Sequence, residues 1–221
     1  MRVKTEHLIP PPSDRTGAVL FQIGSFSPIT YAHLRLFEAA KDKLRQAGFH
    51  VCGGYLSPAN DAYKKSSLVP ATHRLSMCRL ALRELEHIAI DEWEARADRF
   101  VPSYEVASRL HTALSAWRRH IQLFLVCGSD LLLSMGNPNS WPRQSVLKLV
   151  SFCRFIVKSR NGQKPDISDD VPLVQEVMWI DAWVGDHSST LVRHHLKRGQ
   201  SITFMTPKPV IDYIHQHRLY R

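Results

Sequence analysis

The stretch "AVLFQIGSFSPITYAHLRLFE", residues 18–38, decides the fold of this 221-residue chain. Its opening run, residues 18–23, is apolar apart from one glutamine, which is typical of a strand buried on both faces of a sheet. Residues 31–46 follow with apolar side chains at helical spacing: Leu34, Phe37, Ala40 and Leu44. A buried strand that passes through a short turn into a helix predicts the beginning of a strand–helix–strand unit.

The same alternation continues along the rest of the chain. It predicts further strands over residues 50–57, 88–94, 121–130, 152–160 and 176–183. It predicts further helices from Thr72 to about Glu86, over 103–119, from Ser189 to Arg198 and from Pro207 to His217, with Thr72 and Thr206 as N-caps. We therefore expect an α/β fold, a single Rossmann-like doubly wound domain over residues 18–221 with a mostly parallel central sheet. Residues 1–17, which include three consecutive prolines, are expected to form a flexible N-terminal arm.

Composition narrows the class of protein. No apolar run approaches the roughly 20 residues of a membrane helix, and the first residues lack the apolar core of a secretory signal. The four cysteines form no C-x-x-C pair and lie far apart: Cys52, Cys78, Cys127 and Cys153. We therefore expect reduced thiols, no membrane partner and an intracellular location, in the cytoplasm or the nucleus.

The formal net charge of +9 favours an anionic partner, which includes nucleic acid, a membrane surface or a polyphosphate small molecule. The basic residues are scattered in short pairs such as Lys64-Lys65 and Arg118-Arg119, and they form no long basic stripe. We therefore do not expect nucleic acid as the main partner, although charge alone leaves that class open.

The turn after the first predicted strand is the first candidate site. Gly24 has no Cβ atom and so lets a ligand approach the backbone, and Ser25 adds a hydroxyl and a free N–H. His33 lies in the first turn of the predicted helix, where the positive end of the helix dipole favours an anion. An imidazole there can stabilise charge on a phosphoryl oxygen. A histidine that only caps or packs is the alternative.

A second candidate site is "HSSTLVR", residues 187–193. Ser188, Ser189 and Thr190 fall at the start of a predicted helix, where hydroxyls and free N–H groups bind phosphate. Arg193 follows Thr190 by three residues and Ser189 by four, so these side chains share one helix face. Its guanidinium can hold two phosphate oxygens at once. Simple helix capping is again the alternative.

Taken together, the two candidate sites resemble a known enzyme family. The spacing Gly24-x-Phe26-x-Pro28-x-x-x-x-His33, with Thr30 three residues before the histidine, resembles the signature of the nucleotidylyltransferase superfamily. More narrowly, the chain resembles the eukaryotic-type nicotinamide mononucleotide adenylyltransferases from about residue 18 to residue 220. The other segments that carry this resemblance are "SPANDAYKKSSLVPATHR" (57–74), "DEWE" (91–94), "CGSDLL" (127–132), "NSW" (139–141), "HSSTLVRHHLKRGQSI" (187–202) and "VIDYIHQHRLY" (210–220).

The resemblance implies that the protein joins ATP to nicotinamide mononucleotide, or to its nicotinic acid form, and releases pyrophosphate without a covalent enzyme intermediate. It implies Mg²⁺ or another divalent cation as the cofactor, bound mainly through the ATP phosphates, with no metal ligands in the protein. Positioning and neutralisation of charge are the main needs of such phosphoryl chemistry. The resemblance also implies a homo-oligomer.

The resemblance further implies roles for individual residues. The catalytic residues would be His33, Lys65 and Arg193. ATP would contact Gly24, Ser25, Phe26, Thr30, Gly128, Asp130, Ser188, Ser189 and Thr190, with Asp130 at the adenosine ribose. The mononucleotide would contact Trp93, Ser103, Trp141 and Arg160, with Trp93 stacked on the pyridine ring. Core packing of the two tryptophans, helix capping by Asp130 and a solvated loop around Lys65 are the alternatives.

Four positions depart from the family pattern: Ser27, Ser140, Gly185 and His187. They leave open the adenine contacts and the preference between the two mononucleotides. Three rival functions also stay open. They are another nucleotidylyltransferase of the same superfamily, a basic nucleic-acid-binding module, and a chaperone-like or scaffolding role on this fold.

Overall fold

The computed structural model describes residues 1–63, 68–159, 177–181 and 187–221. Its strands are β1 (Gly17–Gly24), β2 (His50–Pro58), β3 (Ile88–Ile90), β4 (Ile121–Gly128), β5 (Arg154–Lys158) and β6 (Val177–Ile180). Its helices are α1 (Tyr31–Gln46), α2 (Ala71–Ala81), α3 (Ser103–Trp117), α4 (Ser129–Ser134), α5 (Arg143–Phe152), α6 (Ser189–Lys197) and α7 (Lys208–Gln216). The alternation of strands and helices confirms the α/β prediction.

The strands form one sheet in the order β3-β2-β1-β4-β5-β6, and every neighbouring pair is parallel. The chain begins with β1 in the middle of the sheet, moves outward through β2 to β3, and then crosses to β4 on the other side of β1. The strand order therefore reverses between β1 and β4. In doubly wound sheets this switch point is where ligands bind, beyond the carboxyl ends of the strands.

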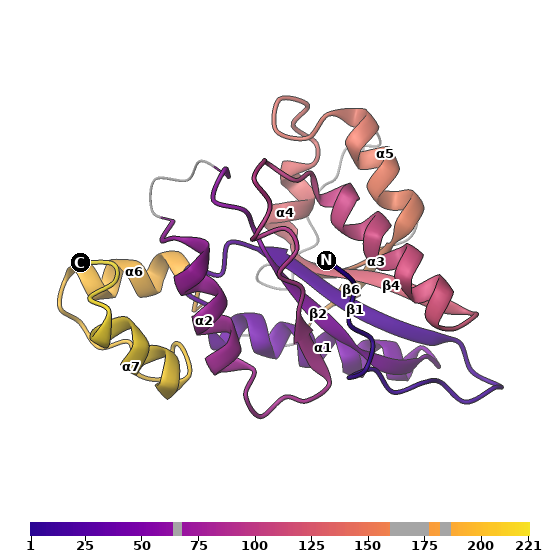
Figure 1. The fold of residues 1–221 in the computed structure, drawn as a ribbon, viewed down its shortest axis with the longest axis horizontal. Coiled ribbons are helices and arrows are strands. Elements are labelled where there is room, and N and C mark those ends of the chain that lie inside the picture. The colour runs from indigo at the N-terminus through magenta and orange to yellow at the C-terminus, as the bar shows by residue number, and fades with distance from the viewer. Residues whose placement is uncertain (64–67, 160–176, 182–186) are drawn as a thin grey trace.

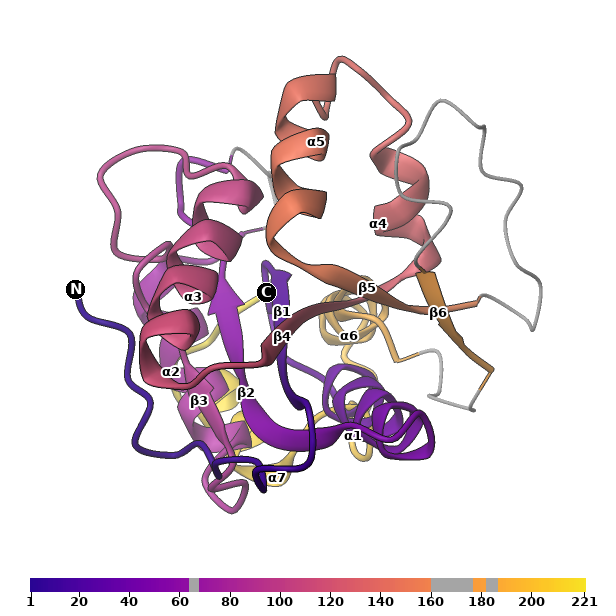
Figure 2. The same ribbon diagram turned by 90° about the vertical axis from the view of Figure 1, so that its right-hand side faces the viewer.

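Helices cover both faces of the sheet (Figures 1 and 2). One face packs against α3, α4 and α5 through a cluster that includes Leu110 and Leu149. The other face packs against α1, α2, α6 and α7 through a cluster that includes Phe37, Met77 and Val192. Because both faces are covered, the central strands β1 and β4 are apolar apart from one glutamine each. No described helix is long and apolar enough to cross a membrane.

Two predicted N-caps are wrong. The helix predicted from Thr72 begins at Ala71 after Pro70, and the carboxylate of Asp61 accepts its first free N–H at 3.0 Å, so a distant side chain replaces the local hydroxyl. The helix also ends earlier than predicted, at Ala81. In α7 the N-cap position belongs to Pro207, because the Thr206 hydroxyl donates instead to the carbonyl of Ile29, at 2.6 Å.

Four predicted strands are shorter than expected within the described residues (β3, β4, β5 and β6), and one helix was missed. The strand predicted over 88–94 ends at Ile90, because the Asp91 side chain pairs with Arg109 and turns the chain away from the sheet. The strand predicted over 121–130 ends at Gly128, where α4 begins. The missed helix is α5, in which only Val146 and Leu149 are buried, so its apolar pattern is weak.

The N-terminal residues lie along the edge of the sheet beside β2. Val3 and Leu8 are buried, the Ile9 N–H donates to the carbonyl of Cys52, and the Tyr55 hydroxyl donates to the carbonyl of Lys4. The division into an arm and a domain stays a prediction. The four cysteines are all buried with free thiols, which agrees with the expected reduced state.

Candidate active site

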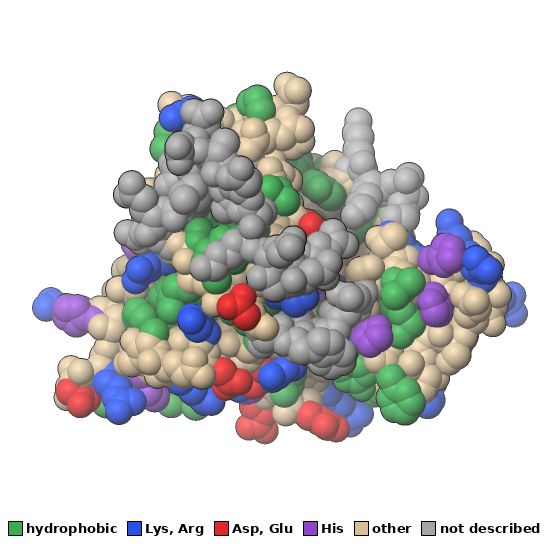
Figure 3. Space-filling view, turned by 180° about the vertical axis from the view of Figure 1, so that it is seen from behind, with side chains coloured by type: hydrophobic (Ala, Val, Ile, Leu, Met, Phe, Trp, Pro, Cys, Tyr) green, Lys and Arg blue, Asp and Glu red, His purple; other side chains and the backbone are tan. Residues whose placement is uncertain are grey.

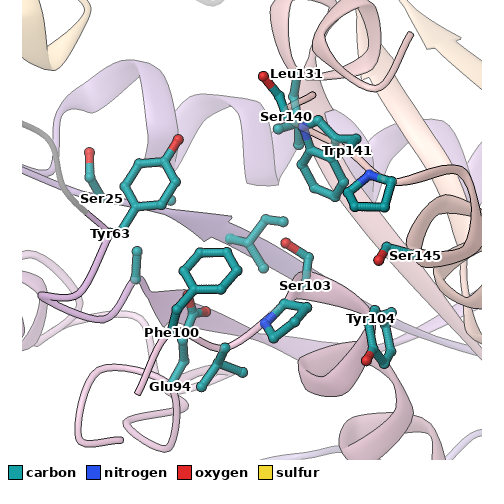
Figure 4. Close-up of a pocket in the computed structure, with 16 residues that line it drawn as sticks. Ser25, Tyr63, Glu94, Phe100, Ser103, Tyr104, Leu131, Ser140, Trp141 and Ser145 are labelled. Atoms are coloured by element: carbon teal, nitrogen blue, oxygen red, sulfur yellow. The ribbon is translucent and has the colours of Figure 1, made fainter. Parts of the chain in front are cut away.

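A cavity of about 490 Å³ opens at the carboxyl edge of the sheet (Figure 4). The end of β1 contributes residues 23–25, the end of β2 contributes Ala59, and the starts of α3 and α5 contribute further lining side chains. Four of the predicted site residues line this cavity: Gly24, Ser25, Ser103 and Trp141. The cavity therefore lies at the switch point, where the strand order predicts a ligand.

Aromatic rings give the cavity its apolar character. Tyr63 and Phe100 stack with their ring centroids 6.4 Å apart and their planes at 18°. Trp141 lies on the opposite side, with Ser103 between it and Phe100 in Figure 4. The indole N–H of Trp141 donates to the Ser134 hydroxyl at 3.0 Å, which fixes the plane of the ring. A flat aromatic ligand fits between such faces.

Trp93 does not line this cavity, so its predicted stacking role is not supported by its position. Its ring packs against the core on the α3 side of the sheet and lies 5.1 Å from the guanidinium carbon of Arg109. Phe100, seven residues later, has the position that the sequence assigned to Trp93. An aromatic residue just before the predicted helix at Ser103 was the signal that would have found it.

Two glycines leave open backbone at the strand ends. A Cβ atom on Gly128 would meet no other atom within 4 Å, and one on Gly24 would touch only the ring of Phe26, at 3.4 Å. Gly128 is also the N-cap position of α4, and Asp130 lies exposed in the first turn of that helix. An acidic side chain there is stabilised by the helix dipole.

His33 is held in one tautomer by its neighbours. The backbone N–H of Thr30 donates to Nδ1 of His33 at 3.1 Å, and the Thr30 hydroxyl lies 2.8 Å from the same atom. Because Nδ1 accepts a hydrogen bond, the proton of the neutral ring must be on Nε2. The side chain is half-buried, and this desolvation lowers the pKa of His33 to about 4. At neutral pH the ring is therefore an uncharged donor.

Phe26 and Thr30 support this histidine rather than the cavity. Phe26 is buried and packs edge-on against the His33 ring, with centroids 5.2 Å apart. It adopts a φ of 44°, in the region that non-glycine residues rarely occupy. Thr30 is the buried N-cap residue of α1. The turn between β1 and α1 thus presents backbone and imidazole, while its larger side chains point inward.

The start of α6 is attached to this same turn, although about 160 residues separate the two segments in sequence. Ser189 donates to the carbonyl of Pro28 at 2.8 Å, and Arg193 donates to the carbonyl of Ser27 at 2.8 Å. Arg193 also donates to the Thr190 hydroxyl at 3.1 Å, which confirms that they share a helix face. Ser188 is the N-cap, and its hydroxyl accepts the N–H of Leu191. Burial lowers the pKa of Arg193.

The last residues of the chain contact the turn as well. The N–H of Tyr31 donates to the carbonyl of Met205 at 3.0 Å. The hydroxyls of Ser27 and Tyr220 lie 2.9 Å apart. The turn that begins at Gly24 is therefore surrounded by residues 189–220, which supply the hydrogen bonds that fix its backbone.

Arg74 is a structural residue that the sequence did not single out. Its side chain is completely buried, and it donates to the carbonyls of Ser25, Ala59 and Val69 at 3.0, 2.7 and 2.9 Å. It also forms a salt bridge with Asp61 at 2.7 Å. One guanidinium thus joins the ends of β1 and β2 to the start of α2.

Glu94 was also missed. It is buried, lines the cavity and follows β3. Its position in "DEWE" made it part of a motif, but nothing in the sequence showed that it rather than Trp93 faces the cavity.

Two predicted site residues, Lys65 and Arg160, lie outside the described residues, as does Gly185. Of the other departures from the family pattern, Ser27 is buried beneath the turn and Ser140 lines the cavity. Within the described part of the chain, no three His, Cys, Asp or Glu side chains gather in an arrangement that would hold a metal ion.

Known proteins are similar to most of this chain. Residues 21–195 match the cytidylyltransferase-like family. The chain is 40% identical to a nicotinamide/nicotinic acid mononucleotide adenylyltransferase of Arabidopsis thaliana, over 94% of this chain and 91% of that protein. It is 32% identical to nicotinamide/nicotinic acid mononucleotide adenylyltransferase 1 of Bos taurus, over 94% of this chain and 90% of that protein.

The fold is also shared with a solved structure, Plasmodium falciparum nicotinic acid mononucleotide adenylyltransferase complexed with NaAD. The TM-score is 0.66 at 22% sequence identity, over 92% of this chain and 97% of that one. Sequence identity over nearly the full length of two relatives, together with the convergence of both predicted motifs on one turn, leads to one conclusion. The chain belongs to the family of nicotinamide/nicotinic acid mononucleotide adenylyltransferases.

Proposed function

We propose that the protein transfers the adenylyl group of ATP to nicotinamide mononucleotide, and to its nicotinic acid form, in NAD biosynthesis. A 5′-phosphate oxygen of the mononucleotide forms a bond to the α-phosphorus of ATP. The bond between that phosphorus and the oxygen that leads to the β-phosphorus breaks in line, and pyrophosphate leaves with the electron pair. The relatives at 40% and 32% identity support this reaction.

The observation that carries the proposal is the junction of the β1–α1 turn, His33 and the start of α6. Since Nδ1 of His33 accepts from Thr30, the Nε2–H is the group that can donate to an α-phosphate oxygen as negative charge grows there. The hydroxyls and N–H groups of Ser188, Ser189 and Thr190 lie at a helix N-terminus that suits the other phosphate oxygens. Arg193 has further N–H donors beyond those that hold the turn.

The mononucleotide is proposed to occupy the cavity. Its pyridine ring would lie between Phe100 and Trp141, with the Ser103 hydroxyl at its edge and its phosphate directed to Gly24 and Ser25. Phe100 thus replaces Trp93 in the stacking role. Gly128 and Asp130 remain the proposed contacts of the adenosine, and Lys65 and Arg160 keep their proposed roles at the phosphates and the mononucleotide.

Mg²⁺ or another divalent cation would neutralise part of the phosphate charge when bound. The side chains at the phosphate end are an imidazole, hydroxyls and a guanidinium, which suit phosphate oxygens and not a cation. This donor set fits a cation held through the oxygens of ATP. Assembly into a homo-oligomer and an intracellular location, in the cytoplasm or the nucleus, are part of the same proposal.

The proposal is tested by mixing the purified protein with ATP, Mg²⁺ and each mononucleotide, and by measuring dinucleotide and pyrophosphate chromatographically. We expect product from the wild type and a kcat at least about a hundredfold lower for His33→Ala, because a donor to the charged transition state is lost. His215→Ala, which changes an exposed histidine on α7, is the matched control and should keep its activity. No dinucleotide from either mononucleotide would contradict the proposal.

A further inference from the structure

One carboxyl group in the cavity has no part in the proposed adenylyl transfer. Glu94 lies in the turn after β3, is only 8% exposed, and lines the cavity together with Phe100 and Ser103. Figure 4 shows Glu94 and Phe100 on one side of the space and Trp141 on the other. The ring of the mononucleotide is proposed to lie between these side chains, so Glu94 borders the part of the substrate that differs between the two forms.

The surroundings of Glu94 control its charge. The Ser57 hydroxyl donates to Oε2 at 3.3 Å, which favours the ionised form. Asn60 donates to the backbone carbonyl of Glu94 at 3.2 Å and holds the turn in place. A hydrogen bond from the backbone of Asn60 also favours the ionised carboxyl group and lowers its pKa. Burial is the largest influence, and it raises the pKa of Glu94 to about 8.

The charged groups nearby have smaller and opposing effects on the pKa of Glu94. Asp91 raises the pKa of Glu94, and Arg74 lowers it. Asp91 is itself paired with Arg109 at 2.7 Å, which weakens its field at Glu94. The other titratable side chains of the cavity wall are Tyr63 and Tyr104. Glu94 is therefore the carboxyl group whose ionisation changes the charge of this cavity between neutral and mildly alkaline pH.

The two mononucleotides respond differently to such a charge. Both carry a positive pyridinium ring, which a carboxylate attracts. The nicotinamide form adds a neutral amide, whereas the nicotinic acid form adds a carboxylate that stays ionised above about pH 5. A protonated Glu94 tolerates either group, while an ionised Glu94 in a poorly hydrated cavity repels only the second carboxylate.

We propose that Glu94 is a specificity-determining residue. Its ionised carboxylate disfavours binding of the nicotinic acid form, whereas the nicotinamide form still binds. This inference rests on the proposed adenylyl transfer. Near neutral pH the protein uses both mononucleotides, and at alkaline pH it prefers the nicotinamide form.

The test is the ratio of kcat/KM for the nicotinamide form to kcat/KM for the nicotinic acid form, measured between pH 6.5 and 9.5. This ratio removes every pH effect that is common to the two substrates. Such effects include the titration of ATP, of the shared 5′-phosphate and of protein groups that affect both substrates equally. We expect it to rise about tenfold through a midpoint near pH 8, the size of effect that two unit charges about 10 Å apart produce at an effective dielectric constant near 20.

Two variants separate Glu94 from other causes. Glu94→Gln has nearly the same shape but cannot ionise, so its ratio should stay constant with pH. Ser57→Ala keeps the carboxyl group and removes the donor that favours its ionised form, so the rise should move to higher pH. A constant ratio in the wild type, or the same rise in Glu94→Gln, would overturn the inference while product formation left the adenylyl transfer intact.

Absence of product with both mononucleotides would instead overturn the proposed reaction. In that event, calorimetric affinities for the two mononucleotides over the same pH range decide the role of Glu94. A ratio of affinities that rises with pH in the wild type and not in Glu94→Gln supports it, and a ratio that does not change overturns it.

Discussion

At position 33 the imidazole is anchored through one nitrogen, because Nδ1 accepts from the start of α1 and the proton of the neutral ring is on Nε2. Protonation of Nδ1 would break the bond to the Thr30 N–H and would place a charge in a poorly hydrated turn. The low pKa and the fixed tautomer therefore agree with each other. The ring stays a neutral donor over the whole physiological pH range.

This low pKa predicts a dependence of stability on pH. In the folded chain His33 stays neutral down to about pH 4, whereas in the unfolded chain it binds a proton near pH 6.5. Between these values the unfolded state holds more protons, so stability falls as the pH falls. From pH 7 to pH 5 the wild type should lose about 2 kcal/mol more unfolding free energy than His33→Gln in urea titrations. Equal losses would contradict the burial of this ring.

At the scale of secondary structure, α6 is the element that is attached to the β1–α1 turn and is proposed to bind phosphate. Arg193 donates to Ser27 and Thr190 at once, which requires a planar guanidinium with several N–H groups. Arg193→Lys keeps the charge but cannot make both bonds and also reach a phosphate. We expect the KM for ATP to rise at least about tenfold, with a smaller change in the KM for the mononucleotide.

The control for this change is Arg198→Lys, at the exposed C-cap of the same helix, which should leave both KM values as they are. Equal increases in both KM values for Arg193→Lys would point to a general loss of structure rather than to the phosphate contacts. Thermal unfolding of the two variants, measured beside the kinetics, separates these outcomes.

The same elements show how far the sequence can predict this fold. Helix α1 begins and ends where its apolar spacing predicted, because the helix is long and its buried face is regular. Helices α2 and α7 begin elsewhere than predicted, because Asp61 accepts the first free N–H of α2 and the Thr206 hydroxyl donates to the carbonyl of Ile29. These partners lie far away in sequence, and local patterns do not contain them.

The site residues show the same contrast between local sequence patterns and tertiary packing. The sequence could bring Gly24, Ser25 and His33 together, because a strand end and a helix start fix their positions within ten residues. Trp93 does not line the cavity, because the chain leaves the sheet at Asp91 and its ring lies near Arg109. Which side of an irregular turn faces a cavity depends on tertiary packing.

At the scale of the whole molecule, Arg74 joins segments that approach the site from different strands. Its bonds to Ser25, Ala59, Asp61 and Val69 set the distance between the β1–α1 turn and the segment that contains Tyr63. Arg74→Lys would leave several of these acceptors unpaired in a buried place. We expect a loss of about 3 kcal/mol in the unfolding free energy and a lower kcat/KM for ATP.

The matched control is Arg79→Lys, on the same helix, whose pair with Glu92 is partly exposed. Its unfolding free energy should change by less than about 1 kcal/mol. If Arg74→Lys were as stable as Arg79→Lys, the buried guanidinium would not be what holds the two strand ends together. Urea titration of both variants provides the comparison.

The attachment of the β1–α1 turn to residues 189–220 has a consequence for biosynthesis. All six strands have been translated once residue 180 is made, so the sheet can assemble on the ribosome while the chain is still growing. The partners of Ser27, Pro28 and Ile29 lie in residues 189–220, so they are made after the strands of the described sheet. The turn between β1 and α1 therefore gains the hydrogen bonds that fix its backbone only in a late stage of synthesis.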